Sequence, residues 1–225
     1  ELAFTAIVTT DVIMMGRLGS TSLAAGTLAA QYFWVFEFLA MGILSALAPI
    51  IAQHLGARRF RRVRGTIRQG FWVAILVAIP CGLMIWNAGS IFIFLGQDPV
   101  VATMGQAYMG YMLIGLLPSL WHAILGDFLA AHERPRTVLV ICIIGIAINA
   151  LANYAFMFGH FGAPAMGLAG AGVASAMVMI FMFLAVLCFV LTDRRLKRYH
   201  LLGHFWRLDW PQLRSIITVG LPIAM

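Results

Sequence analysis

The stretch GARRFRRVRGTIRQG, residues 56–70, places six arginines between two long apolar runs, at residues 23–53 and 69–95. Further apolar runs lie at 106–131, 137–158 and 168–192, with shorter ones at 1–15 and 213–225. A helix needs about 20 apolar residues to cross the hydrocarbon core of a bilayer. The chain is 62% hydrophobic and only 10% charged, whereas a soluble domain is about 25% charged. The sequence therefore predicts an all-α integral membrane protein, built as a six-helix transmembrane bundle.

The basic residues occur in alternate connections between these runs. Fourteen of the fifteen Lys and Arg residues follow the second, fourth or sixth run, and Arg17 is the exception. Because basic loops stay on the cytoplasmic side, we expect these loops and the N-terminal side of the first run to be cytoplasmic. The same residues would contact anionic lipid head groups. Their confinement to loops argues against nucleic acid as a partner.

The runs divide the chain into three parts. Residues 1–192 are predicted to form one transmembrane lobe, and residues 193–212 a cytoplasmic amphipathic linker with Tyr199, Trp206 and Trp210 among basic residues. Residues 213–225 are predicted to begin a seventh helix. Because the first run lacks an initiator methionine and the last stops within an apolar stretch, we interpret the chain as an excerpt whose first helix is truncated at its start.

Two smaller patterns predict contacts at the ends of the helices. Gly167, Ala171 and Ser175 recur every four residues at the start of the sixth run. Small residues on one face let membrane helices approach closely, so this helix should pack tightly against a neighbour, most simply the fifth. Asp127, near the inner end of the fourth run, is predicted to pair with Arg134 or Arg136.

Polar side chains inside the runs are the candidate site. Asp11 lies in the first run, and Asn149 and Asn153 lie four residues apart in the fifth, so their amides share one helix face. A carboxylate within a span costs about 2.5–3.5 kcal/mol on insertion scales, so Asp11 needs partners, which the two amides and Ser175 could supply. Asp11 could then exchange a proton, since burial favours the neutral carboxyl, or bind Na⁺ with the amide and hydroxyl oxygens. The alternative is a static network that only holds helices together.

A second group of residues suggests a substrate cavity. Glu37 lies in the second run. Aromatic and thioether side chains close in sequence to Asp11 or to Glu37 could line a plastic cavity for bulky cations: Met14, Met15, Phe33, Trp34 and Met41. The same side chains are also ordinary core residues of a helical bundle. The sequence has one lysine and no phosphate-binding loop of the type G-x-x-x-x-G-K-[ST]. Uphill transport would therefore use an ion gradient or another subunit, and no cofactor is expected.

Several segments together resemble the multidrug and toxic compound extrusion (MATE) family, in its NorM-like bacterial branch. They are TTDVIMMGRLGSTSLAAG, APIIAQHLGARR, RQGFWVAILVAIP, AINALANYAFMFGHFGAPAMGLAGAGVASAM and ITVGLPIAM. The resemblance implies twelve helices in two lobes, of which this chain is the N-terminal one, in a monomeric transporter of the bacterial inner membrane. It implies export of lipophilic, often cationic drugs in exchange for H⁺ or Na⁺, without catalytic residues.

The resemblance also implies roles for individual residues. Asp11, Asn149, Asn153 and Ser175 match the cation site of the family's N-terminal lobe, which makes Na⁺ at Asp11, Asn149 and Asn153 the one metal expected. Some members carry a second acid where Asn153 stands. Glu37 is outside the pattern and is either an additional cation-attracting group or a partner of another helix.

Two other functions remain open from the sequence. A lipid-linked-sugar flippase of the same superfamily would be expected to have cationic residues in its cavity, whereas the charges within the spans are acidic. A membrane-embedded enzyme would need clustered catalytic residues at one depth, and the sequence offers no such cluster.

Overall fold

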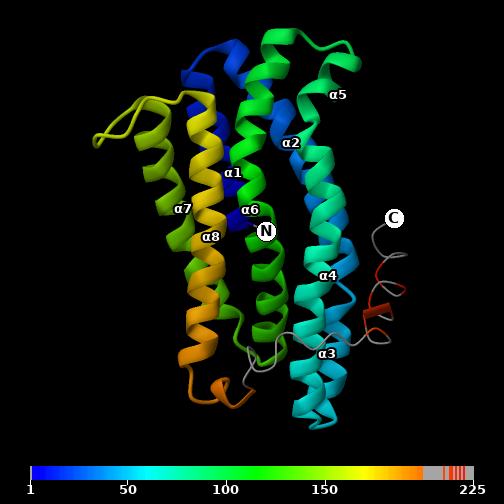
Figure 1. The fold of residues 1–225 in the computed structure, drawn as a ribbon. Helices are drawn as coiled ribbons and strands as arrows, with labels where there is room; N and C mark the ends of the chain where they lie inside the picture. Colours follow the sequence, from blue (N-terminus) through cyan, green and yellow to red (C-terminus); the bar gives the residue numbers. More distant parts are fainter. Residues whose placement is uncertain are drawn as a thin grey trace.

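The computed structural model describes residues 2–199 and, beyond them, residues 210, 213, 214, 216, 218 and 220. These residues are mostly α-helical, and no β-strand occurs among them. The elements in chain order are α1 (Leu2–Arg17), α2 (Ser20–Leu44), α3 (Leu47–Gly56), α4 (Phe60–Trp86), α5 (Ala88–Phe94), α6 (Pro99–Ala131), α7 (Pro135–Phe158), α8 (Leu168–Thr192) and the short 3₁₀ helix η1 (Lys197–Tyr199) (Figure 1).

The long helices have the length and composition of membrane spans. Five stretches of the described chain qualify: Ser20–Gly56, Phe60–Trp86, Pro99–Ala131, Pro135–Phe158 and Leu168–Thr192. Large apolar side chains point outward from them, among them Phe38, Ile79, Ile114, Ile143 and Leu184, each more than half exposed. Such a surface suits lipid rather than water. With α1 as the remaining member, the predicted six-helix transmembrane bundle is confirmed.

Helix α6 lies at the centre of the bundle. It packs against α8 on one side and against α2 and α4 on the other (Figure 1). Helix α7 packs against α8, and α1 packs against both α7 and α2. This arrangement brings α1, the first helix, into contact with α7, which follows it by more than a hundred residues, and so sets the geometry of the candidate site.

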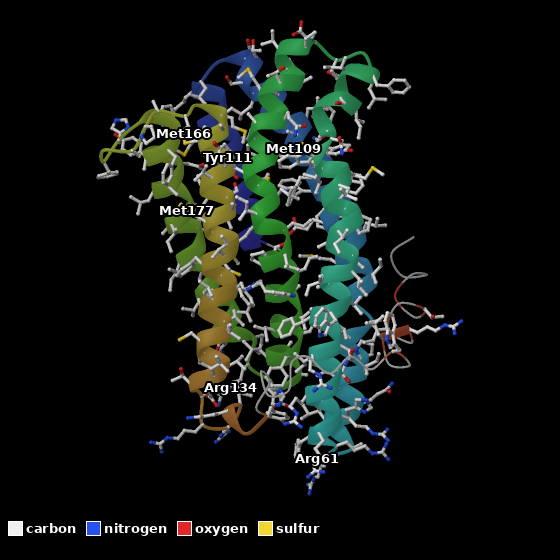
Figure 2. The ribbon with its side chains drawn as sticks, in the orientation of Figure 1. Arg61, Met109, Tyr111, Arg134, Met166 and Met177 are labelled. Carbon is white, nitrogen blue, oxygen red and sulfur yellow. The ribbon has the colours of Figure 1, made fainter. Side chains whose placement is uncertain are left out.

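The connections separate into two groups at opposite ends of the bundle. Those from α1 to α2, from α5 to α6 and from α7 to α8 lie at the upper end of Figure 1, and those from α3 to α4 and from α6 to α7 lie at the lower end. Arg61 and Arg134 are both at the lower end in Figure 2, whereas Met166 is near the upper end. Arg61, at the start of α4, and Arg134, just before α7, therefore lie at the same end of the molecule.

Helix boundaries differ from the sequence prediction mainly around the arginine-rich stretch. Residues 56–70 were expected to form a loop, but only residues 57–59 separate α3 from α4. Arginine is a good helix former, so the helix continues past the apolar run that hydropathy detects. The same helix ends at Trp86, and residues 88–94 form α5 instead of completing the third span. The second run is likewise divided into α2 and α3.

The connection between α7 and α8 folds back over the end of α7. Gly159 ends α7 in the left-handed conformation, with φ of 75°, which glycine adopts without a steric penalty. The Met166 amide then donates to the Phe156 carbonyl at 2.9 Å. A Cβ atom at Gly170 would collide with that same carbonyl. The small residues that begin α8 thus allow a backbone contact with α7, as the sequence predicted.

The larger interface of α8 is with α6 rather than with α7. Gly172 faces the backbone of α6, where a Cβ atom would collide with the Tyr108 carbonyl. The small residues of α8 lie on more than one side of the helix, so α8 fits closely between α6 and α7. The predicted tight packing against the fifth span is therefore present, and α6 is a second close neighbour that the sequence did not indicate.

The chain after α8 is anchored to the basic end of the bundle. Arg134 forms an ion pair with Asp193 at 2.5 Å, so the predicted pairing of Arg134 with Asp127 is wrong. Tyr199 is 3% exposed, its hydroxyl is 2.8 Å from Nε2 of His132, and its ring contacts Phe60 and Phe128 edge-on. Most of the predicted linker, residues 193–212, and of the predicted helix at 213–225 lies outside the described residues.

Candidate cation site and cavity

Asp11 is the centre of a polar cluster that joins three helices. Nδ2 of Asn153 on α7 donates a hydrogen bond to Oδ1 of Asp11 on α1, at 2.5 Å. The Ser175 hydroxyl on α8 donates to Oδ2 of Asp11 at the longer distance of 3.4 Å. Both oxygens of the carboxylate therefore have donors from other helices. The structure brings together the residues that the sequence selected as one site.

The two asparagines complete this cluster from one face of α7. Nδ2 of Asn153 also donates to Oδ1 of Asn149 at 3.2 Å, and both side chains are fully buried. Each keeps one amide atom without a hydrogen-bond partner, namely Nδ2 of Asn149 and Oδ1 of Asn153. An unpartnered buried polar atom costs about 1–3 kcal/mol. The cluster thus has capacity for a further ligand beside Asp11.

Tyr108 of α6 adds a fourth helix to the cluster. Its side chain is buried, and its hydroxyl interacts with Ser175 and lies within electrostatic range of Asp11. The sequence did not indicate this residue, because α6 is apolar around most of its circumference and its periodicity does not show which face points inward. Its position follows from the close approach of α6 and α8 at Gly172.

A cavity of about 330 Å³ extends from this cluster between α1, α2, α6, α7 and α8. Asp11, Asn149 and Ser175 contribute to its wall. Four residues that the sequence suggested for a cavity also line it: Met15, Trp34, Glu37 and Met41. Their role in binding stays a prediction.

Met14 and Phe33, the other two suggested residues, do not line the cavity. On α2 the lining residues Trp34, Glu37 and Met41 share one face, while Phe33 is fully buried on the neighbouring stripe that packs into the core. Met14 precedes Met15 on α1 and therefore points away from the helix face that carries Asp11 and Met15. Proximity in sequence to an acidic residue was therefore not enough to assign a wall position.

A second polar group lies on another part of the cavity wall. Glu37 is 4% exposed and contacts the Ser119 hydroxyl of α6. His122, one turn further along the same face of α6, also lines the cavity. Sequence reasoning selected neither Ser119 nor His122 for the cavity.

The charges around the cavity are of one sign. Asp11 and Glu37 are the carboxylates of its wall, and neither lysine nor arginine lines it in the part of the chain that the structure describes. Much of the remaining wall is apolar, with the thioethers of Met112, Met179 and Met182 prominent. The cavity is thus suited to positive charge and to apolar surface, and unsuited to pyrophosphate.

These features define a multi-pass membrane protein in which a six-helix bundle surrounds an acidic internal cavity. The MatE family model matches residues 1–155. The chain therefore belongs to the MatE family.

Curated relatives match the chain over its whole length. The "Probable multidrug resistance protein NorM" of Mesorhizobium japonicum is 40% identical over 226 residues, which cover 100% of this chain and 48% of that protein. The protein of the same name from Brucella suis is 42% identical over 227 residues, with the same coverage. The chain spans about half the length of these relatives.

Solved structures share the fold. The crystal structure of the eukaryotic MATE transporter AtDTX14 superimposes with a TM-score of 0.86 at 19% identity, covering 99% of this chain and 48% of that one. An inward-facing multidrug resistance MATE family transporter of the MOP superfamily gives a TM-score of 0.82, also at 19% identity, and covers 98% of this chain and 49% of that one. The six-helix bundle of this chain therefore corresponds to about half of each solved transporter.

Proposed function

We propose that this chain is the N-terminal lobe of a cation-coupled multidrug efflux antiporter of the bacterial inner membrane. The observation that carries the proposal is the Asp11 cluster, a carboxylate with amide and hydroxyl partners from α7 and α8 on the wall of an acidic cavity. The names of the curated relatives support multidrug transport. The substrates are lipophilic cations, and the basic end of the bundle faces the cytoplasm.

Asp11 is the point at which the coupling ion binds. In its ionised form the carboxylate accepts the Asn153 amide and the Ser175 hydroxyl. If the side-chain amide of Asn153 rotated so that its nitrogen and oxygen exchanged places, its oxygen, which now has no partner, could accept a hydrogen bond from a protonated Asp11. The carboxylate, the two amide oxygens and the hydroxyl are equally a set of oxygen ligands for Na⁺. The coupling ion is thus H⁺ or Na⁺, and both fit this donor set.

Ion binding at Asp11 would act on the packing of the bundle. The cluster connects α1, α6, α7 and α8, so neutralising its charge changes the attraction among four helices at once. An ion or a cationic drug shifts the protein between access states only as far as it binds one state better than the other. Sites of secondary transporters generally lie near the middle of the membrane at the interface of two repeats, whereas all four helices of this cluster belong to one lobe.

The test is transport by the two-lobe protein in proteoliposomes, with a fluorescent lipophilic cation under a pH gradient and then under a Na⁺ gradient. Asp11→Asn keeps the size of the side chain and removes its charge, so we expect gradient-driven transport to be lost. Asp98→Asn is the matched control: Asp98 caps α6 by accepting from the Val100 amide at 2.7 Å, and asparagine caps helices equally well. Transport at the unmodified rate in Asp11→Asn would refute the proposal.

The alternatives left open by the sequence are less well supported. A flippase for lipid-linked sugars would need cationic groups for the pyrophosphate, and neither lysine nor arginine lines the cavity among the described residues. The curated relatives are named as drug-resistance proteins rather than as enzymes.

A further inference from the structure

We propose that Glu37 and His122 form a separate subsite of the cavity, which binds the N–H group of a protonated amine attached to an apolar body. The inference deepens the proposed function and rests on it: the drug's charged group binds at Glu37 while the coupling ion binds at Asp11. The subsite consists of Glu37, Ser119 and His122, which line the same cavity as Asp11.

Asp11 and Glu37 meet different residues of α6. Tyr108, in the Asp11 cluster, and Ser119, beside Glu37, are eleven residues apart on α6, which corresponds to about 16 Å along a helix. The carboxylates have different hydrogen-bonding partners, Asn153 and Ser175 for Asp11 but Ser119 for Glu37. We therefore assign them to separate positions on one cavity wall, with the Tyr108 hydroxyl within electrostatic range of both.

Glu37 lacks the donor set that surrounds Asp11. Among the described residues, its hydrogen-bonding side-chain partner is Ser119, whose hydroxyl also donates to the Leu116 carbonyl at 2.8 Å. A hydroxyl has a single hydrogen, so this bond competes with donation to the carboxylate. Glu37 is 4% exposed and forms no ion pair among the described residues. A buried carboxylate with so few partners is stabilised by a cationic ligand.

His122 adds a second hydrogen-bond acceptor to this subsite. Its ring interacts with the backbone of Met182, and its Nδ1 atom is buried without a partner. When one ring nitrogen donates to a carbonyl, the other carries a lone pair. Glu37 and His122 thus offer acceptors alone. A ligand that satisfies both has a positive charge and an N–H donor, as a protonated amine does and a fully alkylated ammonium does not.

The wall beside these acceptors fits an aromatic or aliphatic body. Trp34 and Met41 lie on the same face of α2 as Glu37, and Met112, Met179 and Met182 approach from α6 and α8. Thioethers adapt to irregular apolar shapes, and an indole ring attracts a nearby cation. The cavity volume of about 330 Å³ is in the range of small-molecule sites.

The experiment uses two dyes of equal charge. Acridine orange carries a proton on its ring nitrogen at neutral pH, whereas 10-methyl acridine orange has the same charge without that N–H. Equilibrium binding is measured by fluorescence anisotropy on the purified two-lobe protein. We expect tighter binding of acridine orange than of its methyl derivative. Glu37→Gln should weaken binding of both dyes about tenfold or more, and His122→Phe should remove the preference between them.

Controls separate this inference from the proposed function. Glu133→Gln makes the same chemical change at an exposed loop residue and should leave binding unchanged. Unchanged binding of both dyes by Glu37→Gln would overturn the subsite. If that variant does not fold, an unchanged dye preference in His122→Phe overturns it instead. Asp11→Asn should retain dye binding but lose gradient-driven transport, so a failure of the Asp11 proposal is recognised independently of the result at Glu37.

Discussion

Replacement of Gly172 by alanine should destabilise the bundle at the contact between α8 and α6. Gly172 lies in the interior of α8, and a Cβ atom there would collide with the Tyr108 carbonyl. The obstacle is backbone rather than the tip of a flexible side chain, so α6 and α8 have to move apart. Gly110→Ala is the matched control, because Gly110 lies in the interior of α6 with open space around its Cα.

The comparison of the two variants isolates the steric effect. Alanine gains about 1 kcal/mol over glycine inside a helix, and both variants share this gain. Overpacking in a well-packed core costs about 1–3 kcal/mol, and backbone contacts fall at the upper end because they cannot change rotamer. Gly172→Ala should therefore be less stable than Gly110→Ala by about 2–3 kcal/mol.

Thermal unfolding of the two-lobe protein in detergent, followed by tryptophan fluorescence, measures this difference. We expect a lower midpoint for Gly172→Ala by a few degrees, together with weaker coupling-ion binding, since Tyr108 and Ser175 of the Asp11 cluster lie on the two displaced helices. Equal midpoints for the two variants would show that α6 and α8 are not in backbone contact at this position.

Three further predictions concern the ion site and the anchored segment. Asn153→Ala removes a donor from both Asp11 and Asn149, so the ion concentration for half-maximal transport should change about tenfold; an unchanged value would contradict a direct role. Tyr199→Phe loses the hydrogen bond to His132 and should lower the stability by about 1 kcal/mol. Tyr199→Ala also loses the ring contacts and should lower it by about 3 kcal/mol or more. Equal thermal-unfolding midpoints for the two variants would show that the Tyr199 ring does not pack in the bundle. The Arg195 amide, followed by the Leu196 amide and Arg134, keeps the pKa of Asp193 below its ordinary value. The stabilisation that ionised Asp193 provides is therefore complete above about pH 4 and is lost as the pH falls through the lowered pKa. Hydrogen exchange of the Leu196 amide, corrected for its intrinsic exchange rate, should detect this loss.

The sequence was sufficient for the membrane-spanning helices, although not for all of their boundaries, and for three of the four helices of the Asp11 cluster. Apolar runs define the spans because lipid imposes both length and composition. Asn149 and Asn153 could be assigned to one face because their spacing equals about one helical turn. Asp11 and Ser175 could be joined to them because a carboxylate within a span requires polar partners.

The remaining features depend on packing that no local pattern encodes. Tyr108, Ser119 and His122 lie in a helix that is apolar on nearly all sides, so its rotation is set by neighbours such as Gly172 on α8. The partner of Arg134 is Asp193, 59 residues further along the chain, and loop charges carry no information on which of several acids they meet. The start of α4 was missed because the apolar run begins only where the helix enters the membrane, whereas the helix itself begins earlier, in the arginine-rich stretch.

The anchoring of Tyr199 determines which helices would respond to a force applied along the chain beyond it. The segment from Asp193 to Tyr199 could span about 20 Å if it were extended, but here it is fastened by Arg134 and by contacts of Tyr199 with α4 and α6. A pull transmitted along the chain beyond Tyr199 would therefore act on α4 and α6 rather than on the end of α8. The force would act on the bundle at its central helix, α6, and would not act directly on the contact between Ser175 of α8 and Asp11.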